Sequence, residues 1–178
     1  VEMILAIFMI LAGLNFSLYY RVLQRRSLKG IFTDPEARGY IGILAAATFL
    51  IAGSLITGMK LPILKALRYA FFQVASICTT TGFSSTDFAL WPSFAQAVIF
   101  LLMFIGGCAG STAGALKVAR VILLFKYMKK QIKRAARPRM MIQAKLGESH
   151  VKDSVVHEIL AFFFIYFFLS FFIKRIFD

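Results

Sequence analysis

Long apolar stretches dominate the pattern of hydrophobic and polar positions along the chain. Residues 41–59, 159–173 and 3–20 carry no charged side chain. A fourth stretch, 94–105, continues through small residues as far as Ala115. A helix needs about 20 mostly apolar residues to cross a bilayer, with a range of about 17–25. The pattern therefore predicts an all-α membrane protein with four spanning segments, of which the third is interrupted and the last is short.

The composition supports the membrane class. Hydrophobic residues make up 60% of the 178 residues, including 20 Phe, and charged residues make up 16%. A soluble domain carries roughly 25% charged residues. The chain begins at Val1 inside an apolar stretch, and Glu2 is not the basic flank of a signal peptide. We therefore interpret the chain as an internal part of a longer membrane protein.

Basic residues are distributed unevenly between the apolar stretches. Five lie between positions 21 and 38, eleven between 117 and 152, and three between 59 and 92. Because cytoplasmic connections carry an excess of Lys and Arg, the first and third connections are predicted to be cytoplasmic and the second to be outside. Membrane-flanking charge explains the basic stretch 126–139 without nucleic acid, although anionic lipid or a cytoplasmic partner also fits it.

A short helix followed by threonines and a glycine lies between the second and third spanning segments. Residues 63–78, after Pro62, predict a helix of about 24 Å, too short to cross a bilayer with its flanks. Thr79-Thr80-Thr81-Gly82-Phe83-Ser84 follows directly. In a carbonyl filter, backbone oxygens replace the hydration shell of an ion, and glycine permits the dihedral angles that turn them inward. We predict a re-entrant pore loop with an ion filter; a surface loop with a Thr-rich turn is the alternative.

Glycines interrupt the apolar stretch that follows this motif. Residues 94–125 are too long for one ordinary crossing, and four glycines lie within the nine residues 106–114. Each glycine inside a helix costs roughly 1 kcal/mol relative to Ala, so a break is expected. The sequence predicts a gating loop made by Gly106, Gly107, Gly110, Ser111, Thr112 and Gly114. Close helix packing through the Gly106–Gly110 pair is the alternative.

Two basic residues follow this loop on the predicted cytoplasmic side. Lys117 and Arg120 lie one helical turn apart. Their side chains either extend to the membrane interface or repel cations near the inner mouth of a conduction path. We assign both residues to that inner mouth.

The chain offers no support for catalytic chemistry. Residues 110–114 do not form the G-x-S-x-G turn of a nucleophile, and no phosphate-binding loop can be read there. His150 and His157 lie near the predicted cytoplasmic edge without a partner set, and the spanning stretches contain no acidic residue to act as a base. We therefore expect neither enzymatic activity nor a cofactor.

Two motifs together resemble a known family. They are Thr79-Thr80-Thr81-Gly82-Phe83-Ser84 with Asp87-Phe88 and Trp91-Pro92, and the stretch Phe104-Ile105-Gly106-Gly107-Cys108-Ala109-Gly110-Ser111-Thr112-Ala113-Gly114-Ala115-Leu116-Lys117-Val118-Ala119-Arg120. Over nearly its whole length the chain resembles the Trk/Ktr/HKT superfamily of potassium transporters, most closely the membrane subunit of the bacterial Trk potassium uptake system. It departs from the usual pattern at Ala115, where a second glycine is common.

The resemblance implies that one polypeptide carries four M1-P-M2 repeats around a single pore, each made of a helix, a pore loop and a second helix that can be broken. Residues 1–38 would end one repeat, 39–125 would form a complete repeat, 126–153 a basic cytoplasmic connection, and 154–178 the M1 helix of the next repeat. Thr80, Thr81, Gly82 and Phe83 would bind K⁺ as part of the filter. Residues 106–114 would gate the path below them.

The same resemblance implies a homodimer that crosses the bacterial inner membrane several times. It also implies a ring of cytosolic nucleotide-binding regulatory subunits of the TrkA type, for which the basic stretch 126–145 is the candidate contact. The predicted function is potassium transport by a pore-forming subunit, and a non-conducting membrane scaffold is the alternative. A scaffold should tolerate Gly82→Ala, whereas a filter should lose selectivity or flux.

Overall fold

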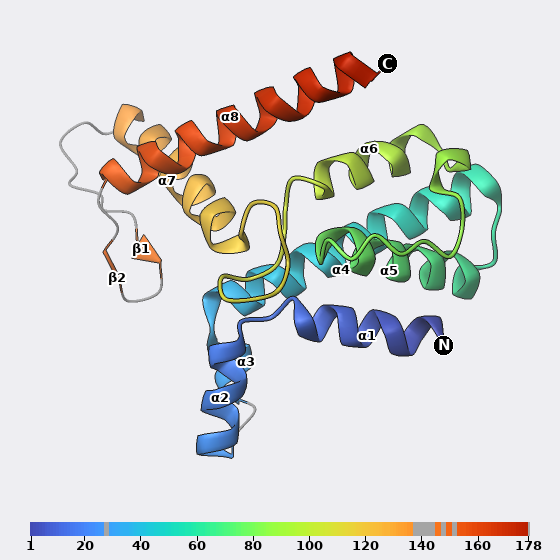
Figure 1. The fold of residues 1–178 in the computed structure, drawn as a ribbon, viewed down its shortest axis with the longest axis horizontal. Helices are drawn as coiled ribbons and strands as arrows, with labels where there is room; N and C mark the ends of the chain where they lie inside the picture. Colours follow the sequence, from blue (N-terminus) through green and yellow to red (C-terminus); the bar gives the residue numbers. More distant parts are fainter. Residues whose placement is uncertain (27–28, 137–144, 147–148, 151–152, 178) are drawn as a thin grey trace. The chain divides into compact units, whose positions relative to one another are not determined.

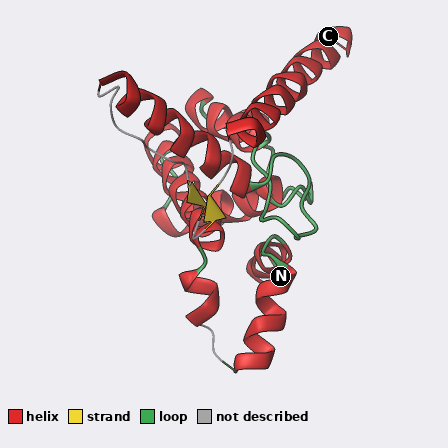
Figure 2. Ribbon diagram, turned by 90° about the vertical axis from the view of Figure 1, so that its left-hand side faces the viewer, coloured by secondary structure: helices red, strands yellow, loops and turns green. Residues whose placement is uncertain are grey.

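Helices joined by loops make up nearly all of the structure. The structure, a computed structural model, describes residues 1–26, 29–136, 145–146, 149–150 and 153–177. These separate into two compact units, Val1–Val118 and Ala119–Asp178. Among the described residues, strands occur only as two short ones in the second unit (Figure 2). The predicted helical class is confirmed, with one small sheet that the all-α prediction did not include.

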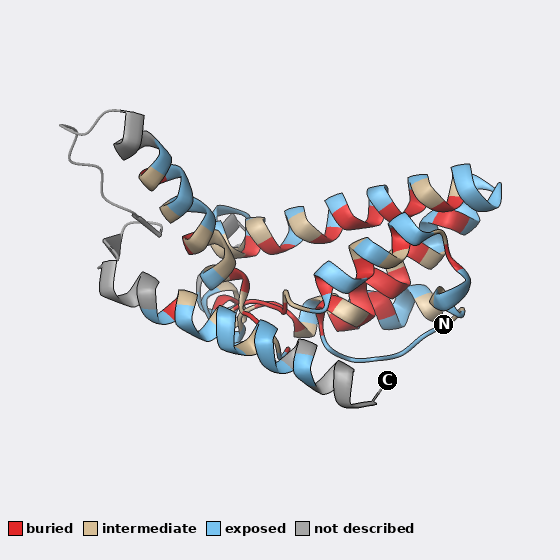
Figure 3. Ribbon diagram, turned by 90° about the horizontal axis from the view of Figure 1, so that it is seen from above, coloured by how far each residue is buried: buried red, intermediate tan, exposed pale blue. Residues whose placement is uncertain are grey.

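Three helices of the first unit pack around a fourth, α5. In chain order it contains α1 (Glu2–Ala12), α2 (Phe16–Arg25), α3 (Lys29–Thr33), α4 (Pro35–Met59), α5 (Ile63–Cys78), η1 (Phe88–Leu90) and α6 (Ser93–Leu102) (Figure 1). Helices α1, α4 and α6 all contact α5, and α6 also contacts α4. Buried residues lie along the facing sides of these helices (Figure 3). The short helix that the sequence predicts before the Thr-rich motif is therefore the centre of this unit.

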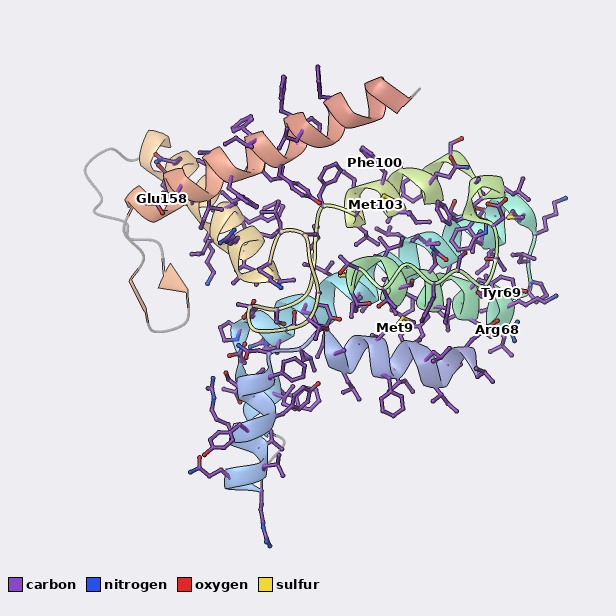
Figure 4. All side chains as sticks on the ribbon, viewed as in Figure 1. Met9, Arg68, Tyr69, Phe100, Met103 and Glu158 are labelled. Carbon is purple, nitrogen blue, oxygen red and sulfur yellow. The ribbon has the colours of Figure 1, made fainter. Side chains whose placement is uncertain are left out.

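Small and apolar side chains hold α1 against α5. Ala6 and Met9 of α1 form a buried cluster with Phe72 and Ala75 of α5. Met9 lies on the side of α1 that faces α5 (Figure 4). Alanines on both helices allow the two backbones to approach closely, which favours helix association where lipid competes for the same apolar surface.

Helix α4 is long and apolar, as predicted. It begins at Asp34, whose Oδ1 atom accepts hydrogen bonds from the N–H groups of Glu36 at 2.9 Å and Ala37 at 3.0 Å. It ends at Lys60, whose φ of 53° is left-handed. Among the described residues it is the one unbroken helix with the length and composition to cross a membrane. The predicted stretch 41–59 is confirmed, and α4 extends it by a more polar first turn.

The first apolar stretch, which the sequence predicts as one spanning segment, forms two helices. The axes of α1 and α2 are bent by 89°, and only together do they reach the length of a span. Asn15 caps α2 by accepting a hydrogen bond from the Ser17 N–H at 2.9 Å. A Cβ atom at Gly13 would overlap the Tyr40 hydroxyl of α4, so the bend has no room for a side chain there. Because most residues on both sides of the bend are apolar, the hydropathy pattern does not reveal it.

The stretch after the Thr-rich motif is broken, as predicted. Helix α6 ends at Leu102, and regular helix resumes only with α7 (Val118–Ala136). We call residues 103–117 the central loop; within it, Ile105 and Leu116 form an isolated bridge. The alternative of helix packing through Gly106 and Gly110 is wrong, because neither residue is helical.

The second unit contains most of α7, two short strands and α8 (Asp153–Phe177). Strand β1 (Lys145–Leu146) pairs antiparallel with β2 (Ser149–His150). The Arg120 guanidinium carbon of α7 lies 5.1 Å from the centroid of the Phe162 ring of α8, which is a cation–π contact. The apolar part of α8, Glu158–Leu169, is shorter than a full span. Residues 137–144 of the predicted partner contact lie outside the described residues.

Candidate functional site

The Thr-rich motif starts where α5 ends, and hydrogen bonds fix that start. The N–H groups of Thr79 and Thr81 donate to the carbonyl oxygens of Ala75 at 3.1 Å and Ser76 at 2.9 Å. The Thr79 hydroxyl also donates to the Ala75 carbonyl at 2.7 Å and lies 2.7 Å from the Thr81 hydroxyl. The motif is therefore a direct, well-anchored continuation of the helix.

Two residues of the motif have a left-handed backbone. The φ angle is 56° at Thr80 and 81° at Gly82. This conformation costs a non-glycine residue roughly 1–2 kcal/mol, whereas glycine adopts it readily. A Cβ atom at Gly82 would meet no heavy atom within 4 Å, so glycine is required here by conformation and not by space.

The residues of the predicted filter are exposed in this chain. Thr80, Thr81, Gly82 and Phe83 are all exposed, with 56% of Phe83 accessible, whereas Thr79 before them is buried. The motif therefore presents its threonines, its glycine and their backbone on the outside of the first unit. A partner surface or an aqueous path can reach them.

A buried polar side chain of α5 lies near the end of the motif. Gln73 is only 2% exposed, and its Oε1 atom lies 3.4 Å from the Ser84 hydroxyl oxygen. The Ser84 hydroxyl has one proton, and the Thr86 carbonyl oxygen at 2.5 Å is its nearer acceptor. The contact with Gln73 is therefore weak, and the firm anchoring of the motif on α5 is at its start.

Backbone contacts also close the central loop. The Gly106 N–H donates to the Leu116 carbonyl at 2.8 Å, and the Leu116 N–H donates to the Phe104 carbonyl at 3.2 Å. A Cβ atom at Gly106 would overlap the Gly114 carbonyl oxygen. Glycine is therefore needed where the two ends of the loop come together.

The central loop binds the bend between α1 and α2. The Cys108 N–H donates to the Gly13 carbonyl at 2.9 Å, and the Phe16 N–H donates to the Gly110 carbonyl at 3.2 Å. Gly110 has a φ of 72°, and its Cβ position would be 3.0 Å from the Asn15 Oδ1 atom. Two helix interruptions that are far apart in the sequence therefore lie against each other.

The same loop contacts the predicted filter and the start of α4. The Gly114 N–H donates to the Thr80 Oγ1 atom at 2.8 Å, so the predicted filter and the predicted gating loop touch directly. The Ala109 N–H donates to the Glu36 Oε1 atom at 2.6 Å. Sequence reasoning missed Glu36, because 73 positions separate it from Ala109 and no local pattern links the two.

The two basic residues that follow the predicted gating loop have different surroundings. The Lys117 amino group donates to the Ala113 carbonyl inside the central loop. Arg120 is exposed and contacts the Phe162 ring within the second unit. Lys117 is therefore bound to the predicted gating loop, whereas Arg120 belongs to the contact between α7 and α8.

Oxygen atoms are the ligands that this site offers. Cys78 and Cys108 are buried free thiols, and the Cys78 Sγ atom lies 3.7 Å from the Gly106 carbonyl oxygen. In the part of the chain that the structure describes, no group of three or more His, Cys, Asp and Glu is arranged to hold a metal ion. A cation at the motif would meet backbone carbonyls and threonine hydroxyls, which are ligands for hard cations.

Known proteins match almost the entire chain. Residues 1–177 match the family described as TrkH, cation transport protein. The Trk system potassium uptake protein TrkH of Halomonas elongata is 36% identical over 171 residues, which are 96% of this chain and 36% of that protein. TrkH of Escherichia coli (strain K12) is 37% identical over 169 residues, 93% of this chain and 35% of that protein. The crystal structure of the potassium transporter TrkH from Vibrio parahaemolyticus matches with a TM-score of 0.85 and 33% identity, covering 91% of this chain and 35% of that one.

Proposed function

Because the chain belongs to the TrkH family of cation transport proteins, we propose that it is part of the pore-forming subunit of a potassium uptake system. The chain spans about a third of the length of these relatives, so other segments must complete the pore. The contact between Gly114 and Thr80 carries the proposal, because it joins the two features that a gated pore requires. In this proposal K⁺ moves down its electrochemical gradient, without covalent chemistry or a cofactor.

Thr80, Thr81, Gly82 and Phe83 are the proposed ligands of K⁺. Their carbonyl oxygens would replace the hydration shell of the ion, as in other potassium filters. The left-handed angles at Thr80 and Gly82, the exposure of the motif and the hydrogen bonds that anchor its start on α5 support this assignment. The C-terminal end of α5, which leads into the motif, carries the negative end of the helix dipole and favours a cation there.

The central loop is the proposed gate. Irregular backbone at membrane depth is tolerated only where it is buried in protein or lines water. The loop satisfies this condition through its contacts with the bend and with Thr80. Its gating residues are Gly106, Gly107, Gly110, Ser111, Thr112 and Gly114, and the charges of Lys117 and Arg120 would form the inner mouth.

The order of helices α4 to α7 along the chain fits one M1-P-M2 repeat. Helix α4 would be M1, α5 and the Thr-rich motif would form the re-entrant pore loop, and α6, the central loop and α7 would form the broken M2. The complete repeat would then cover residues 39–125, after the end of one repeat at 1–38. Residues 126–153 would connect it to the M1 helix of the next repeat at 154–178.

The relatives are components of Trk systems, which supports a membrane location and a multi-component assembly. We place the chain in the bacterial inner membrane as a multi-pass segment of a homodimer. A cytosolic nucleotide-binding regulatory subunit of the TrkA type would bind the basic stretch 126–145.

Gly82→Ser in the full-length parent tests the proposed filter. A side chain at a φ of 81° is strained, so the carbonyl positions should change while the surrounding space remains sufficient. Rubidium or potassium uptake and growth on low potassium are measured in a bacterial host that lacks its own uptake systems. We expect uptake to fall, or discrimination between Na⁺ and K⁺ to collapse.

Gly42→Ser in α4 is the matched control, because its Cβ position is also open but its backbone is helical. It should transport as the parent does, and both variants must reach the membrane in equal amounts. Unchanged flux and selectivity in Gly82→Ser would contradict the filter assignment.

A further inference from the structure

We infer that the Glu36 carboxylate is the positioning residue that holds the central loop across the potassium path, an inference that rests on the function proposed above. Its Oε1 atom accepts a hydrogen bond from the Ala109 N–H at 2.6 Å, in the middle of the loop. Glu36 and Ala109 are both half-buried. A bond between a backbone N–H and a carboxylate is charge-assisted, and such bonds are stronger than neutral ones.

The start of α4 presents this carboxylate on a fixed support. Glu36 lies in the first turn of α4, and the Asp34 side chain caps that turn by accepting the N–H groups of Glu36 and Ala37. The helix end is therefore capped without the Glu36 carboxylate. The positive end of the helix dipole also favours a negative charge at this position. Because α4 packs along α5 and α6, the carboxylate is tied to the framework that carries the filter.

The central loop needs an anchor outside itself. It contains four glycines, so ordering it costs more conformational entropy than ordering an ordinary loop. Its one charged side chain, Lys117, binds the Ala113 carbonyl within the loop. Ala109 lies between Cys108, which is bound to the Gly13 carbonyl, and Gly110, whose carbonyl accepts the Phe16 N–H. Glu36 therefore holds the loop at the point where it meets the bend between α1 and α2.

The other end of the loop touches the proposed filter. The Gly114 N–H donates to the Thr80 Oγ1 atom at 2.8 Å, five residues after Ala109. A loop that is released at Glu36 keeps this contact at one end but loses its strongest polar anchor on α4. The loop should then leave its position below the filter more often, and the path should be open for a larger fraction of the time.

Three substitutions separate this role from a general effect on folding. Glu36→Ala removes the acceptor, whereas Glu36→Gln keeps an acceptor oxygen without the charge and should have an intermediate effect. Asp34→Asn removes a charge two positions away while retaining an N-cap residue, and it is the matched control. We expect the labelling rate of Cys108, described next, to rise about tenfold in Glu36→Ala, which corresponds to the loss of a hydrogen bond to a charged group.

The movement of the loop and the flux of ions are measured separately in membrane vesicles that contain the full-length parent. Cys108 is 0% exposed and adjoins Ala109, and its thiol reacts with a small membrane-permeant maleimide only when the loop leaves its place. Because the Glu36 charge also acts on this thiol, the rate is compared between Glu36→Ala and Glu36→Gln, which both lack the charge. All other cysteines are replaced, including Cys78. Rubidium uptake without added nucleotide reports whether the path is open.

Faster labelling of Cys108 together with raised rubidium uptake in Glu36→Ala, and parent values in Asp34→Asn, would support the inference. Equal labelling rates in Glu36→Ala and Glu36→Gln would overturn it, as would faster labelling in Glu36→Ala with unchanged uptake. If Glu36→Ala does not reach the membrane, the rubidium uptake of the isosteric Glu36→Gln decides, and uptake no higher than that of Asp34→Asn would overturn the inference. A parent that carries no rubidium or potassium at all would instead refute the proposed function.

Discussion

Replacing Gly107 with Ala should push the central loop away from the bend between α1 and α2. A Cβ atom at Gly107 would lie 2.7 Å from the Gly13 carbonyl oxygen, 2.8 Å from the Ser111 Oγ atom and 2.9 Å from the Ala113 Cβ atom. Ser111 can rotate, but the Gly13 carbonyl is backbone and accepts the Cys108 N–H at 2.9 Å. The strain can therefore be relieved only by lengthening the contact between loop and bend.

The magnitude follows from steric overlap and not from backbone conformation. Gly107 is not among the residues with positive φ, so Ala can adopt its dihedral angles. Inserting a methyl group into a packed region costs about 1–3 kcal/mol. Gly42 of α4 has no heavy atom within 4 Å of its Cβ position outside its own helix backbone, and Ala should add roughly 0.5–1 kcal/mol of stability there. The two variants should therefore differ by about 1.5–4 kcal/mol.

Thermal unfolding of the purified full-length parent in detergent measures this difference. Gly107→Ala should lower the Tm relative to the parent, whereas Gly42→Ala should leave the Tm unchanged or raise it. Equal Tm values for the two variants would refute the reasoning, because they would show that the loop and the bend are not in close contact at Gly107.

Two further substitutions test the contacts at each end of the site. Asn15→Ala removes the cap of α2 and should cost about 0.5–2 kcal/mol in thermal unfolding, whereas Asn15→Asp should retain the stability of the parent. Thr80→Val removes the acceptor of the Gly114 N–H and should cost about 0.5–1.5 kcal/mol, because both residues are exposed. Thr57→Val is its control, because the Thr57 hydroxyl donates only to carbonyls of α4. Equal losses for Thr80→Val and Thr57→Val would argue against a contact between filter and loop.

Local signals in the sequence account for the helices that position the site. The structure places α5 at Ile63–Cys78, with the bounds that the sequence predicts, because Pro62 precedes it and the threonines end it. The density of glycines between α6 and α7 likewise predicts the break in the following helix. These features can be predicted from the sequence because the residues that cause them lie within a few positions of the helix ends that they determine.

Long-range contacts account for what the sequence does not show. In the sequence, Gly13 is a single glycine within an apolar stretch, and nothing local marks it as necessary. Only the structure shows that Tyr40 of α4 lies beside it and leaves no room for a side chain. Asn15 before Ser17 does carry a capping signal, and this signal could have indicated the bend. The pairing of Glu36 with Ala109 depends on how α4 packs against the rest of the unit, which no local pattern encodes.

The two helix breaks in the first unit depend on each other. A break leaves backbone N–H and C=O groups without partners in their own helix, and in an apolar environment these groups must be paired within the protein. The Gly13 carbonyl finds its partner in the Cys108 N–H at 2.9 Å, and the Phe16 N–H finds its partner in the Gly110 carbonyl at 3.2 Å. Straightening either break would leave polar groups of the other unpaired. A displacement of the central loop must therefore break its hydrogen bonds to the bend between α1 and α2 or carry the bend with it.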